Sequence, residues 1–345
     1  MIFFRDQGLF AAPFDARTLS VTGVPVRVVD HVGIAPDGAP VASLSRGGSL
    51  LYATGTTEAS TLVWVSRRGE QVPVTTTRRL YFGLRVSPDG RRIVVQTSGD
   101  LWILDLERST FTRLTSPTTF SNSFPIWTPD GKRVVFRTAV GAHWIDVDRM
   151  ATAHRIPDTT NGDFPTSVAP DGDTVLVVRQ TGDGSPDLYA LSLSGKSPPR
   201  PIVSTAAFEG GGMFSPDGRW IVYVSDESGQ RQVYVRPSQG ERRWQVSTEG
   251  GTAPVWSRNG RELFYRDGNK IMAVEVAAGA DLALSSPHFL FEHAYAYGPT
   301  ITIPNYDVTP DGQRFLLVQD ESEARRFEFV LNWFAELNRL VKQPR

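Results

Sequence analysis

The sequence predicts an all-β fold of the propeller class, and three observations lead to that prediction. A turn motif recurs, in which a small residue precedes Pro-Asp-Gly. Its copies, two degenerate ones included, are separated by 42, 41, 41, 46, 42 and 52 residues. Short apolar segments follow each copy, and a period near forty residues with four strands per period is typical of a β-propeller. The five full copies begin at Ser87, Thr128, Ala169, Ser215 and Thr309, and the degenerate ones at Ser45 and Ser257.

Each copy of the motif predicts a hairpin between an inner strand and a second strand. In the copy at Ser215, the hydroxyl can accept a backbone N–H, Pro216 sets φ, and Gly218 supplies the last turn position. The second strands that follow are apolar on both faces, as in 221–224 and 175–178. A strand that lies between two sheets need not alternate, and blades stacked around an axis provide that environment.

The first thirty-one residues read as a truncated repeat. Residues 2–6, Ile-Phe-Phe-Arg-Asp, match residues 263–267, Leu-Phe-Tyr-Arg-Asp, and after a one-residue gap the match continues to Asp30 and His31. The chain therefore opens at a second strand, which suggests that Met1 is an internal start or a fragment boundary. At the other end, 306–308, 315–318 and 327–331 predict three strands without a fourth.

Two ways of closing the ring remain open. In the favoured one, eight blades form within a single domain over residues 1–345, the first lacking its inner strand and the last its outer strand. In the other, seven blades form, and Val26 to Val29 completes the last. The tail 332–345 contains an apolar stripe at 333–341, which predicts a short helix that covers the incomplete last blade. A helix that binds a partner is the alternative.

Composition excludes several classes of function. Thirty-six basic and 37 acidic residues nearly cancel without a run of one sign, so we expect no nucleic-acid surface. The chain contains no Cys, which excludes disulfides and thiolate metal sites. No segment is long and apolar enough to predict membrane insertion, and the start does not resemble a signal peptide. As written, the chain is expected in the cytoplasm, or outside it if it belongs to a membrane-anchored protein.

The repeats resemble those of TolB, which also occur in the propellers of prolyl oligopeptidase-type peptidases. The ordered series is similar to the propeller regions that follow the kinase domain in many bacterial serine/threonine kinases. Segments that carry this resemblance include 100–106, 214–228, 234–237, 260–265 and the ending 330–333. The resemblance implies an accessory or sensor domain. It does not imply kinase activity, because the chain has no Gly-rich phosphate loop, His-Arg-Asp or Asp-Phe-Gly motif.

Catalytic and metal-binding motifs are not apparent. Residues 182–186 do not fit the Gly-x-Ser-x-Gly elbow of a hydrolase. The five His residues are scattered, so neither a metal site nor a cofactor is predicted. The chain is thus expected to be no enzyme. A propeller hydrolase or lyase at the channel mouth, and the non-catalytic propeller of a larger peptidase-like protein, remain as alternatives.

The loops from each outer strand to the next inner strand form the predicted binding face. They carry aromatic residues with polar neighbours, which are usual anchors for ligands displayed on a rigid scaffold. We expect a protein or peptide partner there, or a small ligand. The candidate contact residues are Arg78, Arg79, Tyr81, Phe120, Asn122, Phe208, Glu209, His293, Tyr295 and Tyr297.

Overall fold

The structure is a computed structural model of the whole chain. It describes residues 1–5, 8–33, 40–54, 60–116, 122–149, 152–180, 182, 184–277, 281–294, 303–320 and 326–341. The chain divides into two compact units. Unit 1 comprises residues 1–60 and 320–345, and unit 2 comprises residues 61–319.

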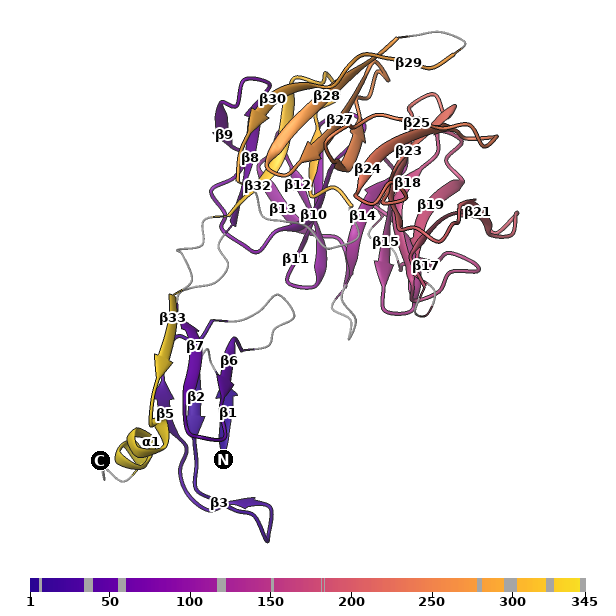
Figure 1. Cartoon of the computed structure of the whole chain (residues 1–345). Coiled ribbons are helices and arrows are strands. Elements are labelled where there is room, and N and C mark those ends of the chain that lie inside the picture. The colour runs from indigo at the N-terminus through magenta and orange to yellow at the C-terminus, as the bar shows by residue number, and fades with distance from the viewer. Residues whose placement is uncertain are drawn as a thin grey trace. The chain divides into compact units, whose positions relative to one another are not determined.

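Unit 2 is a ring of six antiparallel sheets among the described residues, each a blade with its first strand at the axis (Figure 1). The first blade contains β10 (Phe82–Val86), β11 (Arg92–Thr97), β12 (Asp100–Asp105) and β13 (Thr110–Arg113). The second contains β14 (Ser123–Trp127), β15 (Arg133–Thr138), β16 (Gly141–Asp146) and β17 (His154–Arg155). The third contains β18 (Asp163–Val168), β19 (Thr174–Arg179), β20 (Asp187–Ser192) and β21 (Arg200–Val203). The fourth blade contains β22 (Glu209–Phe214), β23 (Trp220–Ser225), β24 (Gln232–Pro237) and β25 (Trp244–Gln245). The fifth contains β26 (Thr252–Trp256), β27 (Glu262–Asp267), β28 (Lys270–Ala277), β29 (Ala283–Leu284) and β30 (His288–Glu292).

The sixth blade joins the two ends of unit 2. Its inner strands are β31 (Tyr306–Val308) and β32 (Arg314–Asp320), and its outer strands are β8 (Ser60–Ser66) and β9 (Gln71–Pro73). Leu62 of β8 is fully buried in one apolar cluster with Leu84, Ile93 and Leu316, so this cluster joins the sixth blade to the first. Apolar burial of this kind is the main stabilising term of the closure.

An ion pair connects the sixth blade to the fifth. Arg67, between β8 and β9, donates from Nη1 and Nη2 to the two carboxylate oxygens of Glu262 at 3.0 and 2.6 Å. Its Nη1 also donates to the carbonyl of Gly312 at 3.1 Å. Bidentate pairs fix geometry as well as energy, so Arg67 holds the β8–β9 hairpin against the fifth blade and the turn of the sixth.

The Pro-Asp-Gly motifs form the predicted turns between first and second strands. At Ser87, the hydroxyl donates to Asp89 at 2.6 Å and accepts the N–H of Arg92 at 2.9 Å, while Gly90 takes a φ of 74°. Glycine adopts this left-handed φ without strain. A Cβ placed at Gly90 would lie 3.1 Å from Pro310 of the sixth blade, so neighbouring turns pack Gly against Pro around the mouth of the channel.

Unit 1 contains two three-stranded sheets among its described residues. One is β1 (Ile2–Arg5), β2 (Gly8–Ala11) and β5 (Val26–Val29), and the other is β6 (Ala42–Leu44), β7 (Leu50–Thr54) and β33 (Arg326–Val330). A short pair, β3 (Phe14–Asp15) with β4 (Ser20–Val21), extends from the first. Their common core contains Leu9, Val29, Leu50 and Trp333.

The sequence predicted the propeller class correctly, but the count of eight or seven blades is not confirmed. The described residues form six blades in one ring, with two three-stranded sheets and one two-stranded pair in unit 1, and the single domain over residues 1–345 stays a prediction. The physical reason is an exchange of third strands. β33, predicted as the third strand after β31 and β32, pairs with β7, and β8 takes the place beside β32. Val26 to Val29 pairs with β2, so it does not complete the last blade.

The predicted C-terminal helix is present as α1 (Trp333–Val341). It packs on unit 1 instead of the β31–β32 blade: the N–H of Trp333 donates to the carbonyl of Gly48 at 2.6 Å, and the Trp333 side chain is buried. A Cβ at Gly48 would come within 2.7 Å of the Phe334 ring. Within the described residues, no helix has the length and apolar character that a membrane crossing needs.

The turn carboxylates predict how stability depends on pH. The hydrogen bond from Ser87 lowers the pKa of Asp89, and that from Thr309 lowers the pKa of Asp311. A carboxyl whose pKa is lower in the folded chain stabilises the fold above its unfolded value of 3.8 and loses that contribution as pH falls below it. We therefore expect the melting temperature to fall steeply below about pH 4.

The fifth blade supplies a matched variant, because Asn259 already occupies the Asp position of its turn and accepts from Ser257 at 2.9 Å. Asp217→Asn should keep the fold at pH 7 and make the melting temperature less sensitive to acid. A variant as acid-sensitive as the parent in calorimetric scans from pH 7 to 2.5 would contradict this role of the turns.

Candidate axial binding pocket

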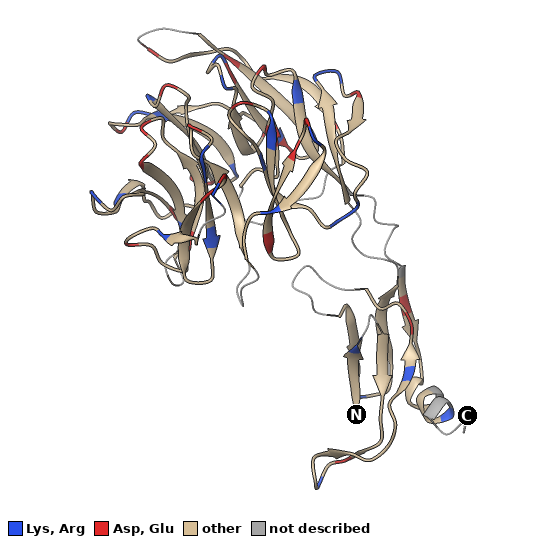
Figure 2. Ribbon diagram, turned by 180° about the vertical axis from the view of Figure 1, so that it is seen from behind, with Lys and Arg blue, Asp and Glu red and all other residues tan. Residues whose placement is uncertain are grey.

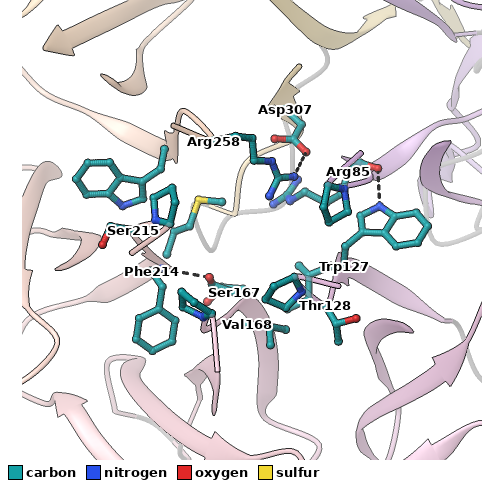
Figure 3. A pocket seen from close by; sticks show the side chains of 17 residues that line it. Arg85, Trp127, Thr128, Ser167, Val168, Phe214, Ser215, Arg258 and Asp307 are labelled. Carbon is teal, nitrogen blue, oxygen red and sulfur yellow. Dashed lines mark hydrogen bonds and ion pairs between the residues drawn. The ribbon is translucent and has the colours of Figure 1, made fainter. Parts of the chain in front are cut away.

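A concave site of unit 2 lies on the axis of the ring, at the mouth formed by the Pro-Asp-Gly turns. It has a volume of about 300 Å³. Its walls come from the inner strands of several blades and from Pro88, Pro129, Pro170 and Pro216 of the turns. Figure 3 shows Arg85, Arg258 and Asp307 at one side of this pocket and Ser167 and Phe214 at another.

The inner strands position these side chains through bulges. The pairing of the first with the second strand shifts register in five blades, for instance between Gly210 and Met213. A bulge bends the strand and re-aims the side chain that follows. In the first four blades the residue two positions before the turn then reaches the axis, and in the sixth blade, whose pairing is regular, Asp307 does so from the same position. Five such residues line the pocket: Arg85, Ile126, Ser167, Met213 and Asp307.

Arg85 and Asp307 come from neighbouring strands, β10 and β31, and their polar atoms are held by the backbone. Arg85 is buried and donates from Nη1 to the carbonyls of Leu84 at 2.6 Å and Pro304 at 2.8 Å. Asp307 Oδ2 accepts the N–H of Val86 at 2.8 Å. Burial lowers the pKa of the Arg85 guanidinium, and the nearby Asp307 carboxylate opposes that shift. These two residues therefore connect the sixth blade to the first.

Arg258 is the polar side chain of this group that faces solvent most. It occupies the Pro position of the degenerate turn in the fifth blade. Its Nη2 donates to the carbonyl of Val86 at 3.0 Å and lies 3.9 Å from Asp307 Oδ2, while about a third of the side chain is exposed. A guanidinium has five N–H donors in a planar fork. Arg258 can therefore keep these contacts and still donate to a ligand in the pocket.

Two Trp residues show how the repeats differ around the pocket. Trp127 donates from Nε1 to the carbonyl of Arg85 at 3.0 Å. Trp256 occupies the same repeat position in the fifth blade, and its buried Nε1 has no hydrogen-bond partner among the described residues. A buried donor without an acceptor is costly. An acceptor supplied by a bound molecule would satisfy it.

The pocket has the chemistry of a binding site. Its lining residues include two Arg and one carboxylate, that of Asp307, but no His, Lys or second carboxylate. General acid–base catalysis needs titratable groups that converge on the substrate. Within the described part of the chain, no cluster of three or more His, Asp or Glu residues could hold a metal ion.

Three of the predicted ligand contacts are buried and hydrogen-bonded to neighbouring residues of the connecting loops and strands. Tyr81 donates to the carbonyl of Thr77 at 3.0 Å, and Asn122 Nδ2 donates to Asp100 at 3.4 Å. Glu209, which is 0 % exposed, accepts from the hydroxyl of Thr205 at 2.6 Å. In this structure their hydrogen bonds hold the loops of the predicted face in place.

The remaining predicted contacts lie apart. Arg78 is exposed, whereas Arg79 lies 4.8 Å from the centre of the Trp102 ring and is half-buried. Phe208 is half-buried beneath Arg231, and His293 bonds to the adjacent carbonyl of Ala294. Phe120, Tyr295 and Tyr297 fall outside the described residues.

Sequence reasoning missed the axial residues, although the sequence contained a signal for one of them. Arg258 breaks the Pro-Asp-Gly pattern at the Pro position within an otherwise regular series. Arg85 and Asp307 are charged residues within apolar inner strands, two positions before a turn. Charged residues at positions that are apolar or small in other repeats would have pointed to the channel.

Comparison with known proteins agrees with the fold. The model of the TolB beta propeller domain family matches residues 139–330, more than half of the chain, so the chain belongs to this family. The structure of a putative TolB from Agrobacterium tumefaciens is 18 % identical, with a TM-score of 0.61 over 76 % of this chain and 99 % of that one.

Two further solved structures resemble the chain. TolB from Acinetobacter baumannii is 16 % identical, with a TM-score of 0.51 over 94 % of this chain and 81 % of that one. Hydrazine synthase from Kuenenia stuttgartiensis is 15 % identical, with a TM-score of 0.51 over 84 % and 94 % of the two chains. At these identities the likeness extends to the fold alone.

The environment of Glu209 gives a test of its structural role. Burial raises the pKa of its carboxyl above 4.5, and the hydrogen bonds from Thr205 oppose the shift. A raised pKa in the folded chain means that stability is lost as pH rises from the unfolded value through the folded one. Glu209→Gln keeps an oxygen acceptor for Thr205. We expect it to be at least as stable as the parent at pH 7 and to show a flatter dependence between pH 4.5 and 7, measured by urea unfolding.

Proposed function

We propose that this chain is a non-catalytic binding module whose axial pocket takes an anionic group of a protein or peptide partner. The single observation that supports this most is Arg258, which stands in the place of a turn Pro with its guanidinium at the pocket. Its contacts, one carbonyl at 3.0 Å and a carboxylate at 3.9 Å, use few of its donors. Guanidinium groups bind carboxylates and phosphates through paired hydrogen bonds.

The size and setting of the pocket favour a side chain or chain end of a larger partner. About 300 Å³ is at the lower limit of small-molecule sites. The rim of Pro rings offers a rigid apolar surface for the rest of a peptide. Basic and acidic residues are interspersed over the blades (Figure 2), and the sequence contains no run of one sign, which favours a local contact over a long polyanion such as nucleic acid.

A binding site on the loop-bearing face has less support, because Tyr81, Asn122 and Glu209 already make hydrogen bonds to Thr77, Asp100 and Thr205. The resemblance to the propeller regions of bacterial kinases supports a role as the sensor or accessory part of such a protein. In that setting the anionic group would be the signal, or the point of attachment to a partner.

An enzyme acting at the channel mouth is the second candidate. A lyase or hydrolase would need a base and an acid that converge on the substrate. The lining of the axial pocket provides Asp307 as its one carboxylate, and two backbone N–H groups already donate to it. This arrangement favours binding over catalysis.

The proposal is tested with a fluorescein-labelled polyglutamate peptide, followed by fluorescence anisotropy at low and moderate salt. Arg258→Ala should weaken binding by about tenfold or more, because hydrogen bonds to charged groups contribute about 1.5–3 kcal/mol. Arg258→Pro restores the regular turn and should weaken binding equally while the melting temperature is kept or raised.

Arg261→Ala is the matched control, since Arg261 follows the same turn but does not line the axial pocket. It should leave the affinity within about twofold, the usual range for a change away from the contact. Equal losses for the Arg261 and Arg258 variants, or no binding of the parent to acidic peptide, would contradict the proposed pocket.

A further inference from the structure

A second concave site of unit 2 lies at the junction of the sixth and first blades, and it shares no lining residue with the axial pocket. Its volume of about 390 Å³ falls within the range of small-molecule sites. The sixth blade contributes residues of β8 and β32 and of the end of β9, and the first blade contributes residues of its turn and of the segment after β12. We call this site the interblade groove.

The apolar part of the interblade groove belongs to the cluster that joins the two blades. Trp64 is a member of that cluster, and Val74 and Leu106 pack against it from the sixth and the first blade. Pro73 adds an exposed ring to the lining. This surface favours a ligand with an apolar body, because removing apolar area from water is stabilising.

Arg314 adds a cation to the groove. Its guanidinium carbon lies 5.0 Å from the centre of the Trp64 ring, and the residue is exposed. Among the residues that the structure describes, this guanidinium has no hydrogen bond and no ion pair. An Arg that stacks on a ring keeps its N–H donors in the plane of the guanidinium, where an acceptor can approach. Arg314 is therefore held in place without being neutralised.

Arg91 supplies a second guanidinium from the first blade. It is exposed, and its side chain likewise has no hydrogen bond or ion pair within the described part of the chain. Among the residues that line the groove, Glu107 has the one carboxylate. Two guanidinium groups against one carboxylate leave one positive charge in excess, so the groove favours an anion.

Another junction of the ring shows how the chain neutralises an Arg at this position. Arg92 has the repeat position of Arg314 in the first blade, and its Nη1 lies 2.9 Å from Asp148 Oδ1 of the second blade. Glu107 has the repeat position of Asp148, yet no ion pair joins it to Arg314 in the described structure. Arg314 thus lacks the acceptor that Arg92 has.

We propose that the interblade groove binds a small organic acid. Its carboxylate or phosphate accepts hydrogen bonds from Arg314 and Arg91. Its apolar body packs on Trp64, Val74 and Leu106. Guanidinium groups bind both kinds of oxyanion through paired hydrogen bonds. The site is independent of the axial pocket and of the partner proposed there.

Binding at this place also stabilises the closure of the ring. The ligand contacts residues of β8 and β9 together with residues of the first blade. A ligand that binds the folded ring and not the unfolded chain raises the stability of the fold. At a free concentration about ten times the Kd, we expect the melting temperature to rise by about 3 °C.

The probes are the para-fluoro derivatives of phenylacetate and of phenyl phosphate, and fluorine NMR during titration with the whole chain measures the Kd of each. We expect saturable binding of at least one probe, and the tighter of the two identifies the oxyanion. Fluorobenzene has no anionic group and inorganic phosphate has no apolar body, so each should bind at least about tenfold more weakly.

Variants locate the binding site. Arg314→Ala and Arg91→Ala should each weaken binding of the tighter probe by about fivefold or more, because each removes charge-assisted donors. Glu107→Gln removes a like charge and should strengthen it. Arg133→Ala is the matched control. Arg133 has the repeat position of Arg314 in the second blade and lies 4.2 Å from the centre of the Trp144 ring, but it does not line the groove. This variant should keep the Kd within about twofold.

Several outcomes would overturn the proposal. One is that neither probe binds the parent saturably. Another is an equal loss for Arg133→Ala and Arg314→Ala, which would show a general change of structure instead of a lost contact. Binding that appears only in Glu107→Gln would mean that Glu107 and Arg314 pair in the parent and close the groove. A rise in melting temperature that Arg314→Ala shares in full would place the ligand elsewhere.

Discussion

The addition of β8 and β9 to β32 is the constraint on which the rest of unit 2 depends. It brings residues 60–73 beside residues 314–320, and it completes the blade that stands between the fifth and the first. Joining segments so far apart in sequence costs chain entropy. Burial of Leu62 among side chains of two blades and the paired contacts of Arg67 with Glu262 offset that cost. The axial pocket exists because this closure places Asp307 beside Arg85.

Regular and irregular repeats have different roles in this molecule. The regular ones provide the scaffold: a Pro, an Asp and a left-handed Gly form each turn, and a hydroxyl adds a hydrogen bond in all of them except the turn at Ala169. Gly90, Gly131 and Gly218 pack on the Pro of a neighbouring turn. The irregular repeats supply the charged side chains of the axial pocket. Arg258 replaces a Pro, and Arg85 and Asp307 replace apolar or small inner-strand residues, so charge enters the channel only where the pattern is broken.

The sequence predicted what local patterns determine. Turn chemistry and apolar strands specified the propeller class, and the stripe at 333–341 specified the helix. The number of blades in the ring depends on which third strand pairs with β32. The pattern of neither candidate decides this pairing, because it joins segments far apart in the sequence: β8 has apolar residues in succession from Leu62 to Val65, and β33 has Phe327, Phe329 and Val330. The decision rests on packing between distant segments, such as Leu62 against Leu316.

The same distinction explains the candidate sites. Aromatic and polar residues in the loops looked like ligand contacts, but Tyr81, Asn122 and Glu209 are already hydrogen-bonded to Thr77, Asp100 and Thr205, which a linear sequence does not reveal. The channel residues were visible as departures from the repeat. Their convergence depends on the bulges in the inner strands and on the closed ring.

The most direct test of this account is the unfolding of a fragment with residues 60–320. If β8 and β9 close the ring as described, the fragment contains all six blades and should unfold in one cooperative transition near the melting temperature of the corresponding transition in the whole chain. A fragment that fails to show such a transition, while the whole chain shows one, would mean that the ring needs unit 1 and would contradict the closure proposed here.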